Sequence, residues 1–111
     1  HDFGKDIMPK MIAEHYNVFA YPYSGYWVDV GTTQSYWQAH MDLLKTPPPI
    51  NLNNRSWVIH TRTEERPPVY IAGNANIRNS MITDGCVISE NTEILDSVLS
   101  PGVFVEPGAR I

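Results

Sequence analysis

Aliphatic residues in the last third of the chain recur with a step of five or six residues. Each is preceded, two positions earlier, by a small or short residue. A step near six is too long for the alternation of a β-hairpin and does not match helical turns, whereas it is typical of the hexapeptide repeat of a parallel β-helix. The pairs are Ala75/Ile77, Ser80/Ile82, Cys86/Ile88, Thr92/Ile94, Ser97/Leu99, Val103/Val105 and Ala109/Ile111.

The repeat predicts that residues 69–111 form a parallel β-helix, in which three flat faces make one coil and the aliphatic side chains fill a narrow core. The two five-residue steps lie seventeen residues apart, as expected for coils that share one shortened corner. Gly85, Gly102 and Gly108 fall between faces, where a corner needs a permissive backbone. Cys86 takes an inward position, and we expect an unreactive core thiol there because a reactive cysteine has to be exposed. A chance run of short β-strands is the alternative.

Two helices are predicted in the first half of the chain. Residues 7–16 carry apolar side chains on one helical face, and Asp6 stands where a cap is needed. Thr33 is placed to cap a second helix that ends at Leu44. The apolar face of this second helix is formed by Tyr36, Trp37, His40, Met41 and Leu44.

Between the two helices, Val18–Tyr23 and Tyr26–Val30 are β-branched and aromatic runs separated by Ser24-Gly25. A two-residue turn between such runs predicts a β-hairpin. The order helix, hairpin, helix predicts a mixed α+β segment for residues 1–46.

Residues 47–68 are predicted to be a proline-rich connector. Pro47-Pro48-Pro49 and Pro67-Pro68 favour extended geometry and forbid helix across themselves. A short strand is expected within the connector at Trp57–Thr61. The aromatic residues are concentrated before it, and the composition changes after it.

Composition narrows the classes of partner. The 111 residues carry a net charge of −4 with a pI near 5.4, so no basic footprint is present for nucleic acid or for an anionic membrane surface. No apolar run approaches the roughly 20 residues that cross a bilayer. The lone cysteine excludes an internal disulfide and fits a reducing, cytoplasmic location. Because the chain opens on His1 and stops at Ile111 inside the repeat, we expect the natural protein to be longer at both ends.

The sharpest candidate for chemistry is the cluster His1–Asp6, just ahead of the first helix. A carboxylate on a loop beside a helix start, such as that of Asp2, is a candidate ligand for Mg²⁺, which takes oxygen donors and uses one or two carboxylates together with substrate phosphates. The alternative is that Asp2 and Asp6 only cap the helix while Lys5 is a solvated charge. The residues by themselves favour the capping interpretation.

A second cluster, Gly25–Thr32, runs from a predicted strand into a tight turn and a helix start. Asp29 and Thr32 are placed to bond backbone donors there, and Gly31 suits a close backbone approach. Structural support is therefore the predicted role of this cluster. The four histidines lack metal-ligand spacing, and none follows His60, so histidine-dependent β-helix chemistry cannot be placed in the repeat.

In combination, these clusters and the repeat resemble the glucose-1-phosphate adenylyltransferase family, also called ADP-glucose pyrophosphorylase, in its bacterial form. The resemblance covers nearly the whole chain, and the ordered combination is more specific than any single motif. Related sugar nucleotidyltransferases share the Trp-x-Asp-x-Gly-Thr turn, so that element alone does not separate them. The matching residues are His1–Pro9, Ala20–Thr32, Trp37, Met41–Leu44, Asn79-Ser80 and Gly85-Cys86.

The resemblance implies an enzyme that joins ATP and α-D-glucose 1-phosphate into ADP-glucose and pyrophosphate in glycogen biosynthesis. It implies that residues 1–46 end a Rossmann-like nucleotidyltransferase domain and that residues 69–111 begin a left-handed β-helix used in subunit assembly, as a homotetramer, and in allosteric control. By the same resemblance Asp2 matches the aspartate that binds the catalytic Mg²⁺ with a second aspartate upstream, which makes it the expected catalytic residue. The nucleotide loop, sugar-phosphate lysine and second aspartate of the family would precede His1, so the chain alone is expected to be inactive.

Two alternatives remain open. A non-catalytic regulatory or assembly subunit of the same family would keep the β-helix and lose catalytic carboxylates, against which the presence of Asp2 and Lys5 argues. A pyrophosphorylase for another sugar nucleotide would differ in a pocket that these residues do not include. The allosteric effector cannot be identified from these residues.

Overall fold

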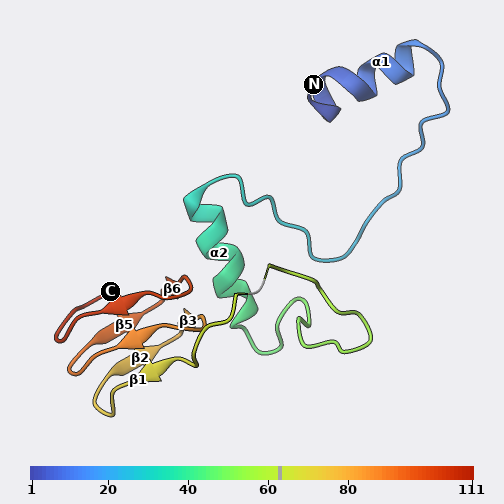
Figure 1. Cartoon of the computed structure of the whole chain (residues 1–111). Helices are drawn as coiled ribbons and strands as arrows, with labels where there is room; N and C mark the ends of the chain where they lie inside the picture. The colour runs from blue at the N-terminus through green and yellow to red at the C-terminus, as the bar shows by residue number, and fades with distance from the viewer. Residues whose placement is uncertain (63) are drawn as a thin grey trace.

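The computed structural model describes residues 1–62 and 64–111, so position 63 of the predicted connector lies outside the described residues. Three helical elements come first: η1 (Phe3–Ile7), α1 (Met8–Ala13) and α2 (Thr33–Leu43). The strands follow in the last third: β1 (Tyr70–Ile71), β2 (Asn76–Arg78), β3 (Met81–Ile82), β4 (Val87–Ile88), β5 (Glu93–Leu95), β6 (Val98–Leu99) and β7 (Phe104–Val105). The molecule is elongated, with principal extents of 64 × 30 × 28 Å, and Figure 1 shows α1 at the end opposite the strands.

The first predicted helix is confirmed with different ends. It opens with the π-helical turn η1, whose N-cap is Asp2 rather than Asp6, and α1 ends at Ala13. The helix stops there because His15 adopts a left-handed backbone conformation (φ 59°) that an α-helix cannot continue. The prediction of a helical segment was therefore correct, whereas the choice of Asp6 as its cap was wrong.

The second predicted helix is present as α2, but its N-cap is Thr32, one residue before the predicted cap. Thr32, in extended conformation, accepts a hydrogen bond from the backbone N–H of Ser35, whose hydroxyl accepts one from the Thr32 N–H. This reciprocal pair satisfies two of the backbone donors that every helix start leaves free. Thr33, the predicted cap, is instead the first helical residue.

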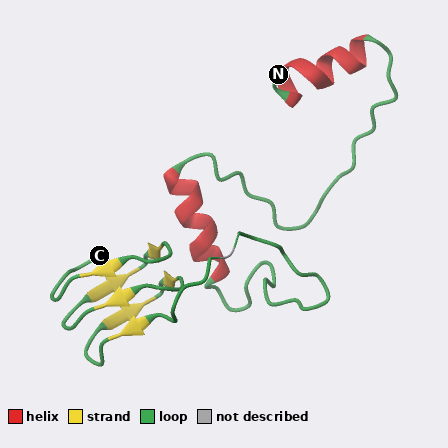
Figure 2. Ribbon diagram, in the orientation of Figure 1, coloured by secondary structure: helices red, strands yellow, loops and turns green. Residues whose placement is uncertain are grey.

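The predicted hairpin over Val18–Val30 is wrong, because the structure has no strand between α1 and α2. Phe19 and Tyr21 are each 88% exposed, and Figure 2 shows the segment as an extended loop. An isolated two-stranded hairpin is at best marginally stable in water, and these runs have no third strand or helix to cover their apolar side chains. The expected α+β segment is thus helical only.

The connector also lacks the predicted strand at Trp57–Thr61. Its ordered features are side-chain turns, in which Asn51 Oδ1 accepts from the Asn53 N–H and Asn54 Oδ1 from the Ser56 N–H. Trp57 is 78% exposed and no strand pairs with the segment in the described part of the chain. The β-branched residues following it therefore stay extended without forming a ladder.

The strands of the last third pair in parallel, and every pair joins residues seventeen positions apart. Strand β4 lies between β1 and β7, with Ile71 opposite Ile88 and Ile88 opposite Val105. Strands β2 and β5 form a second sheet and β3 and β6 a third. Successive strands thus belong to three different sheets, and the chain returns to each sheet after one full circuit (Figure 1).

A narrow core lies between the three sheets and contains the aliphatic residues of the repeat. Ile88 and Ile94 are fully buried, and Leu99 and Val105 are 7% and 3% exposed. Cys86, fully buried beside them, donates its thiol to the carbonyl of Ser100, as its predicted inward position requires. Ile111 is 49% exposed.

The corners between the sheets use left-handed backbone. Gly85, Gly102 and Gly108 have φ of 73°, 74° and 75°, which confirms the prediction that glycines occupy corners. The remaining left-handed corners are Asn79, Asn91 and Asp96, the residue types that tolerate this conformation best after glycine. Stacked corners are linked by side chains, with Asn79 Nδ2 donating to Asp96 Oδ1 at 2.5 Å.

Among the described residues, the helices are too short and too polar for any of them to cross a membrane.

Candidate functional site

Asp2, the predicted catalytic and metal-binding residue, lies exposed at the start of η1. Its Oδ1 accepts a hydrogen bond of 2.7 Å from the Lys5 N–H, so the residue performs the capping role weighed against metal binding. Its Oδ2 has no hydrogen-bond partner among the described residues. Capping and ligation are therefore compatible, because they use different oxygens of one carboxylate.

Asp6 is turned toward the same loop. Its Oδ2 accepts a 2.8 Å hydrogen bond from the Asp2 N–H and lies 3.8 Å from His1 Nδ1. The turn is therefore held by two side chains, because Asp2 accepts from the Lys5 N–H and Asp6 accepts from the Asp2 N–H. Asp6 thus supports the position of Asp2.

The second predicted cluster forms the turn that leads into α2. Asp29 Oδ1 accepts a 3.2 Å hydrogen bond from the Gly31 N–H, and Thr32 caps the helix, so both predicted backbone contacts are present. Asp29 is exposed, and its Oδ2 has no hydrogen-bond partner in the described ranges. Its geometry thus parallels that of Asp2: one oxygen holds a turn and the other is available.

The structure does not bring these two clusters together. In Figures 1 and 2 the amino terminus and α1 stand apart from the beginning of α2. Residues 1–62 and 64–111 contain no group of three or more His, Cys, Asp or Glu side chains able to hold a metal ion. Each aspartate can supply one oxygen donor, and Mg²⁺ uses one or two protein carboxylates when substrate phosphates and water complete its shell.

A hydrogen-bond network on α2 was not foreseen from the sequence. The Asp42 carboxylate accepts from the Tyr26 hydroxyl (2.9 Å) and from Gln38 Nε2 (3.1 Å), and it pairs with Lys45 Nζ at 2.7 Å. These donors, Lys45 first, hold the pKa of Asp42 below its usual value. Burial, together with the hydrogen bond to Asp42, raises the pKa of the Tyr26 phenol.

The opposite side of α2 contacts the strand region. Trp37 Nε1 donates a 2.6 Å hydrogen bond to the carbonyl of Asp96, and the Met41 sulfur lies 3.9 Å from Asn79 Nδ2. Met41 is 7% exposed and is the one buried residue of the helix. Apolar spacing placed Trp37 and Met41 on one face, but nothing in the sequence indicated the corner residues that they meet. The N–H of a partly buried indole usually finds a hydrogen-bond partner, and that requirement was the available signal.

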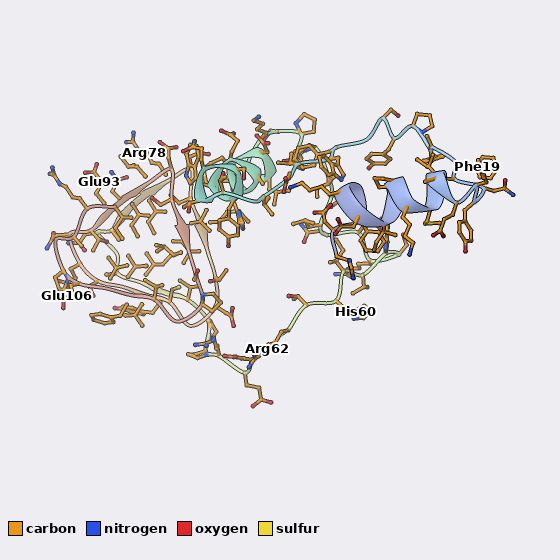
Figure 3. The ribbon with its side chains drawn as sticks, turned by 90° about the horizontal axis from the view of Figure 1, so that it is seen from above. Phe19, His60, Arg62, Arg78, Glu93 and Glu106 are labelled. Carbon is orange, nitrogen blue, oxygen red and sulfur yellow. The ribbon has the colours of Figure 1, made fainter. Side chains whose placement is uncertain are left out.

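Charged side chains outside these contacts surround the strands. Figure 3 shows Arg78, Glu93 and Glu106 directed outward from the strand region, while Phe19 lies at the other end of the molecule near α1. Within the connector, Arg62 and Arg66 both pair with Glu64, at 3.2 Å and 2.6 Å. Glu64 therefore neutralises part of the positive charge of the two arginines.

Comparison with known proteins gives two findings. The family described as Nucleotidyl transferase matches residues 1–46. Over the whole chain, the sequence is similar to proteins named glucose-1-phosphate adenylyltransferase, as the resemblance drawn from the motifs had indicated.

Three of these relatives show how similar the sequences are. The protein of Clostridioides difficile is 48% identical over 99% of this chain, that of Fervidobacterium nodosum 50% over 100%, and that of Halalkalibacterium halodurans 49% over 100%. The chain spans 28%, 26% and 28% of their respective lengths, so it corresponds to about a quarter of each relative.

Proposed function

We propose that this chain is part of a glucose-1-phosphate adenylyltransferase, which makes ADP-glucose and pyrophosphate from ATP and α-D-glucose 1-phosphate in glycogen biosynthesis. The observation that carries the proposal is the 48–50% identity, over nearly the whole chain, to relatives of that name. Since those relatives are about four times longer, most of the residues that such an enzyme needs are outside this chain. The 111 residues alone are therefore proposed to be inactive.

The proposal includes a division of the chain. Residues 1–46 would end the nucleotidyltransferase domain, in agreement with the family match to the same residues. Residues 47–68 would connect, and residues 69–111 would begin a left-handed β-helix of hexapeptide repeats. The seventeen-residue pairing register and the left-handed corners support this last assignment.

The proposed reaction forms one bond and breaks one. A phosphate oxygen of the sugar phosphate attacks the α-phosphorus of ATP, and the bond from that phosphorus to the bridging oxygen breaks as pyrophosphate leaves. Both reactants are anionic, so catalysis depends on positioning and on neutralising charge, with no covalent nucleophile from the protein. Bound Mg²⁺ would supply part of that neutralisation, and Asp2 is the residue of this chain proposed to hold it.

Asp2 is proposed to hold the metal with the oxygen that its cap leaves available. The fit rests on donor chemistry, because a hard cation prefers a carboxylate and Oδ2 of Asp2 is exposed beside a helix start. Asp29 offers the same kind of oxygen at the other turn, and the test below includes it. Lys5 and Asp6 hold the Asp2 turn through the bonds described above.

Kinetics of the enzyme that carries this sequence test the assignment. Asp2→Asn should lower kcat by roughly 100- to 1,000-fold, as loss of one transition-state electrostatic contact does. The helix start should survive, because asparagine caps as well as aspartate. The measurement is ADP-glucose formation at saturating Mg²⁺, with circular dichroism as the check on folding.

Glu14→Gln is the matched control, because Glu14 follows α1 directly and its carboxylate meets only the exposed Lys10 at 3.7 Å. We expect kcat within about twofold of the parent, as for surface substitutions generally. Near-normal turnover of Asp2→Asn would return Asp2 to capping alone, and a large loss in Asp29→Asn instead would move the ligand role to Asp29. Robust ADP-glucose formation by the 111-residue chain would contradict its proposed inactivity.

We further propose that the β-helix self-associates, as part of a cytoplasmic homotetramer under allosteric control. Apolar side chains exposed on the outside of the strand region, such as Phe104 at 64% and Tyr70 at 61%, support association. Sedimentation of the chain at increasing concentration should show oligomers, whereas a monomer that melts sharply at high concentration would contradict the proposal.

A further inference from the structure

Both ends of the segment Tyr26–Thr32 are attached to helix α2. At its far end Thr32 is the N-cap of the helix, and at its near end the Tyr26 hydroxyl donates to Asp42 Oδ2 at 2.9 Å, almost three turns further along the helix. Asp29 lies between these two points and holds its own turn through the Gly31 N–H. The segment is therefore a loop whose position is defined by one helix.

The Tyr26–Asp42 hydrogen bond belongs to a network of three donors around one carboxylate. The Asp42 side chain is 14% exposed and receives donors from Tyr26, Gln38 and Lys45, so its negative charge is shared among three partners. Charge-assisted hydrogen bonds of this kind are stronger than neutral ones. Tyr26 is itself half-buried, while Tyr21 and Tyr23 before it are exposed, so the hydroxyl of Tyr26 is the one directed at the helix.

The other side of the same helix is attached to the strands. Trp37 donates to the Asp96 carbonyl, at a left-handed corner with φ of 47°, and the side chain of Asp96 accepts from Asn79 in the corner seventeen residues earlier. Asn79 in turn lies against the sulfur of Met41. Figure 1 accordingly shows α2 beside β3 and β6. Helix α2 thus has the loop on one side and two stacked corners on the other.

We propose that Tyr26, Asp42 and Trp37 are positioning residues that make the placement of the loop Tyr26–Thr32 depend on the strand region. Trp37 and Asp42 lie five residues apart on one α-helix, so a shift at either attachment displaces the other. The geometric part of this inference stands on the hydrogen bonds alone. Its consequence for catalysis rests on the proposed function.

Hydrogen exchange of the full chain tests the geometric part without any substrate. The amides of Gly31 and Ser35, which donate to Asp29 and Thr32, report on the loop, and those of Val87 and Glu93, which donate to carbonyls of the next coil, report on the strands. Trp37→Phe removes the N–H donor but keeps an aromatic ring, and it should speed exchange in the loop about three- to tenfold while the strand amides keep their rates. The matched control Trp57→Phe, at an exposed tryptophan, should leave both sets unchanged.

A double-mutant cycle makes the test decisive. Tyr26→Phe should also speed exchange at Gly31 and Ser35, and the double variant should show little more than the larger single effect, because both bonds act through α2. The proposal would be overturned if Trp37→Phe left the exchange rates of Gly31 and Ser35 unchanged, or if the effects of the two substitutions multiplied in the double variant. If Trp37→Phe loosened the strands as well, Met41→Leu would replace it in the cycle, since it removes the sulfur contact with Asn79 on the strand side of α2.

In the enzyme of the proposed function, Trp37→Phe should lower kcat several-fold with KM for ATP unchanged. A misplaced loop would lower kcat and also speed hydrogen exchange in the loop. Loss of folded protein would lower the concentration of active enzyme, but loop exchange in the molecules that remain folded would be normal. Unchanged kcat beside altered exchange would overturn the catalytic consequence, and altered exchange would still support the link itself.

Discussion

The two halves of this chain contain similar proportions of apolar residues but use them differently. In the strand region each aliphatic residue of the repeat meets another seventeen positions away, and Ile88 and Ile94 are completely buried. In the first half, Phe19, Tyr21 and Trp27 are all more than three-quarters exposed. The repeat carries its own partners within a short stretch of sequence, whereas the aromatic runs of the first half depend on surfaces that the described residues do not provide.

This difference explains which elements form. A strand in the repeat needs only the next circuit of the same chain to complete its hydrogen bonds, so even two-residue strands are paired. The first half forms helices, which satisfy their backbone groups internally, and leaves its β-branched segments extended. Local periodicity is thus sufficient for a solenoid-like region and insufficient for a sheet whose strands are far apart in sequence.

The largest expected effect is in the core of the strand region. Ile94→Ala removes a fully buried side chain and should lower the free energy of unfolding by about 2–5 kcal/mol. Ile12→Ala, at a position 61% exposed in α1, should cost less than about 0.5 kcal/mol apart from helix propensity. Urea denaturation of both variants measures the contrast, and equal losses would contradict the division into a packed and an unpacked half.

A smaller effect is expected at the corners. Gly102→Ala forces alanine to adopt φ near 74° and should cost about 1–2 kcal/mol of unfolding free energy. A Cβ there would lie 2.6 Å from Arg66 Nη1, the mobile end of a side chain, so Gly108→Ala, which meets nothing within 4 Å, should cost nearly as much. Gly73→Ala, with open space and no positive φ, is the control and should be neutral or slightly stabilising. Thermal melts of the three variants decide whether backbone conformation or crowding dominates.

The smallest expected effect is on the dependence of folding stability on pH in the acid range. The pKa of Asp42 is held below its ordinary value by Lys45, Tyr26 and Gln38, so the carboxylate binds fewer protons in the folded than in the unfolded chain. Its contribution to stability is therefore complete above the ordinary aspartate pKa of about 4 and is lost as the pH falls through the lower folded value. Urea midpoints between pH 7 and pH 2.5 should fall more steeply for the parent than for Asp42→Asn. Parallel curves would show that the network contributes no linked stability.

Much of the strand region could be predicted from the sequence. The inward positions, the buried Cys86 and the three glycine corners follow from a repeat that places equivalent residues at equal spacing. Asn79, Asn91 and Asp96 occupy the remaining corners, and their residue types were a signal that could have been used. The hairpin and the connector strand failed because β-propensity describes how a segment fits a sheet and does not supply one.

The candidate site shows the same limit. The contacts of Asp29 and Thr32 were predictable, because they lie within three residues of their partners. The bond from Trp37 to Asp96 spans 59 positions, and the bond from Tyr26 to Asp42 spans 16, so neither leaves a local pattern. For Asp2 the two interpretations of the sequence turned out to be compatible, since the cap uses one carboxylate oxygen and leaves the other available.

The constant register of the strand region also limits how its length can change. Every strand pairing joins residues seventeen positions apart, and the side-chain bonds Asn79–Asp96 and Asn74–Asn91 have the same spacing. Insertion of one residue would turn every later side chain in that coil to the wrong face, whereas insertion of a complete coil would preserve all contacts above and below it. Insertions and deletions in this region are therefore expected to preserve the fold only when they add or remove a complete unit of seventeen residues.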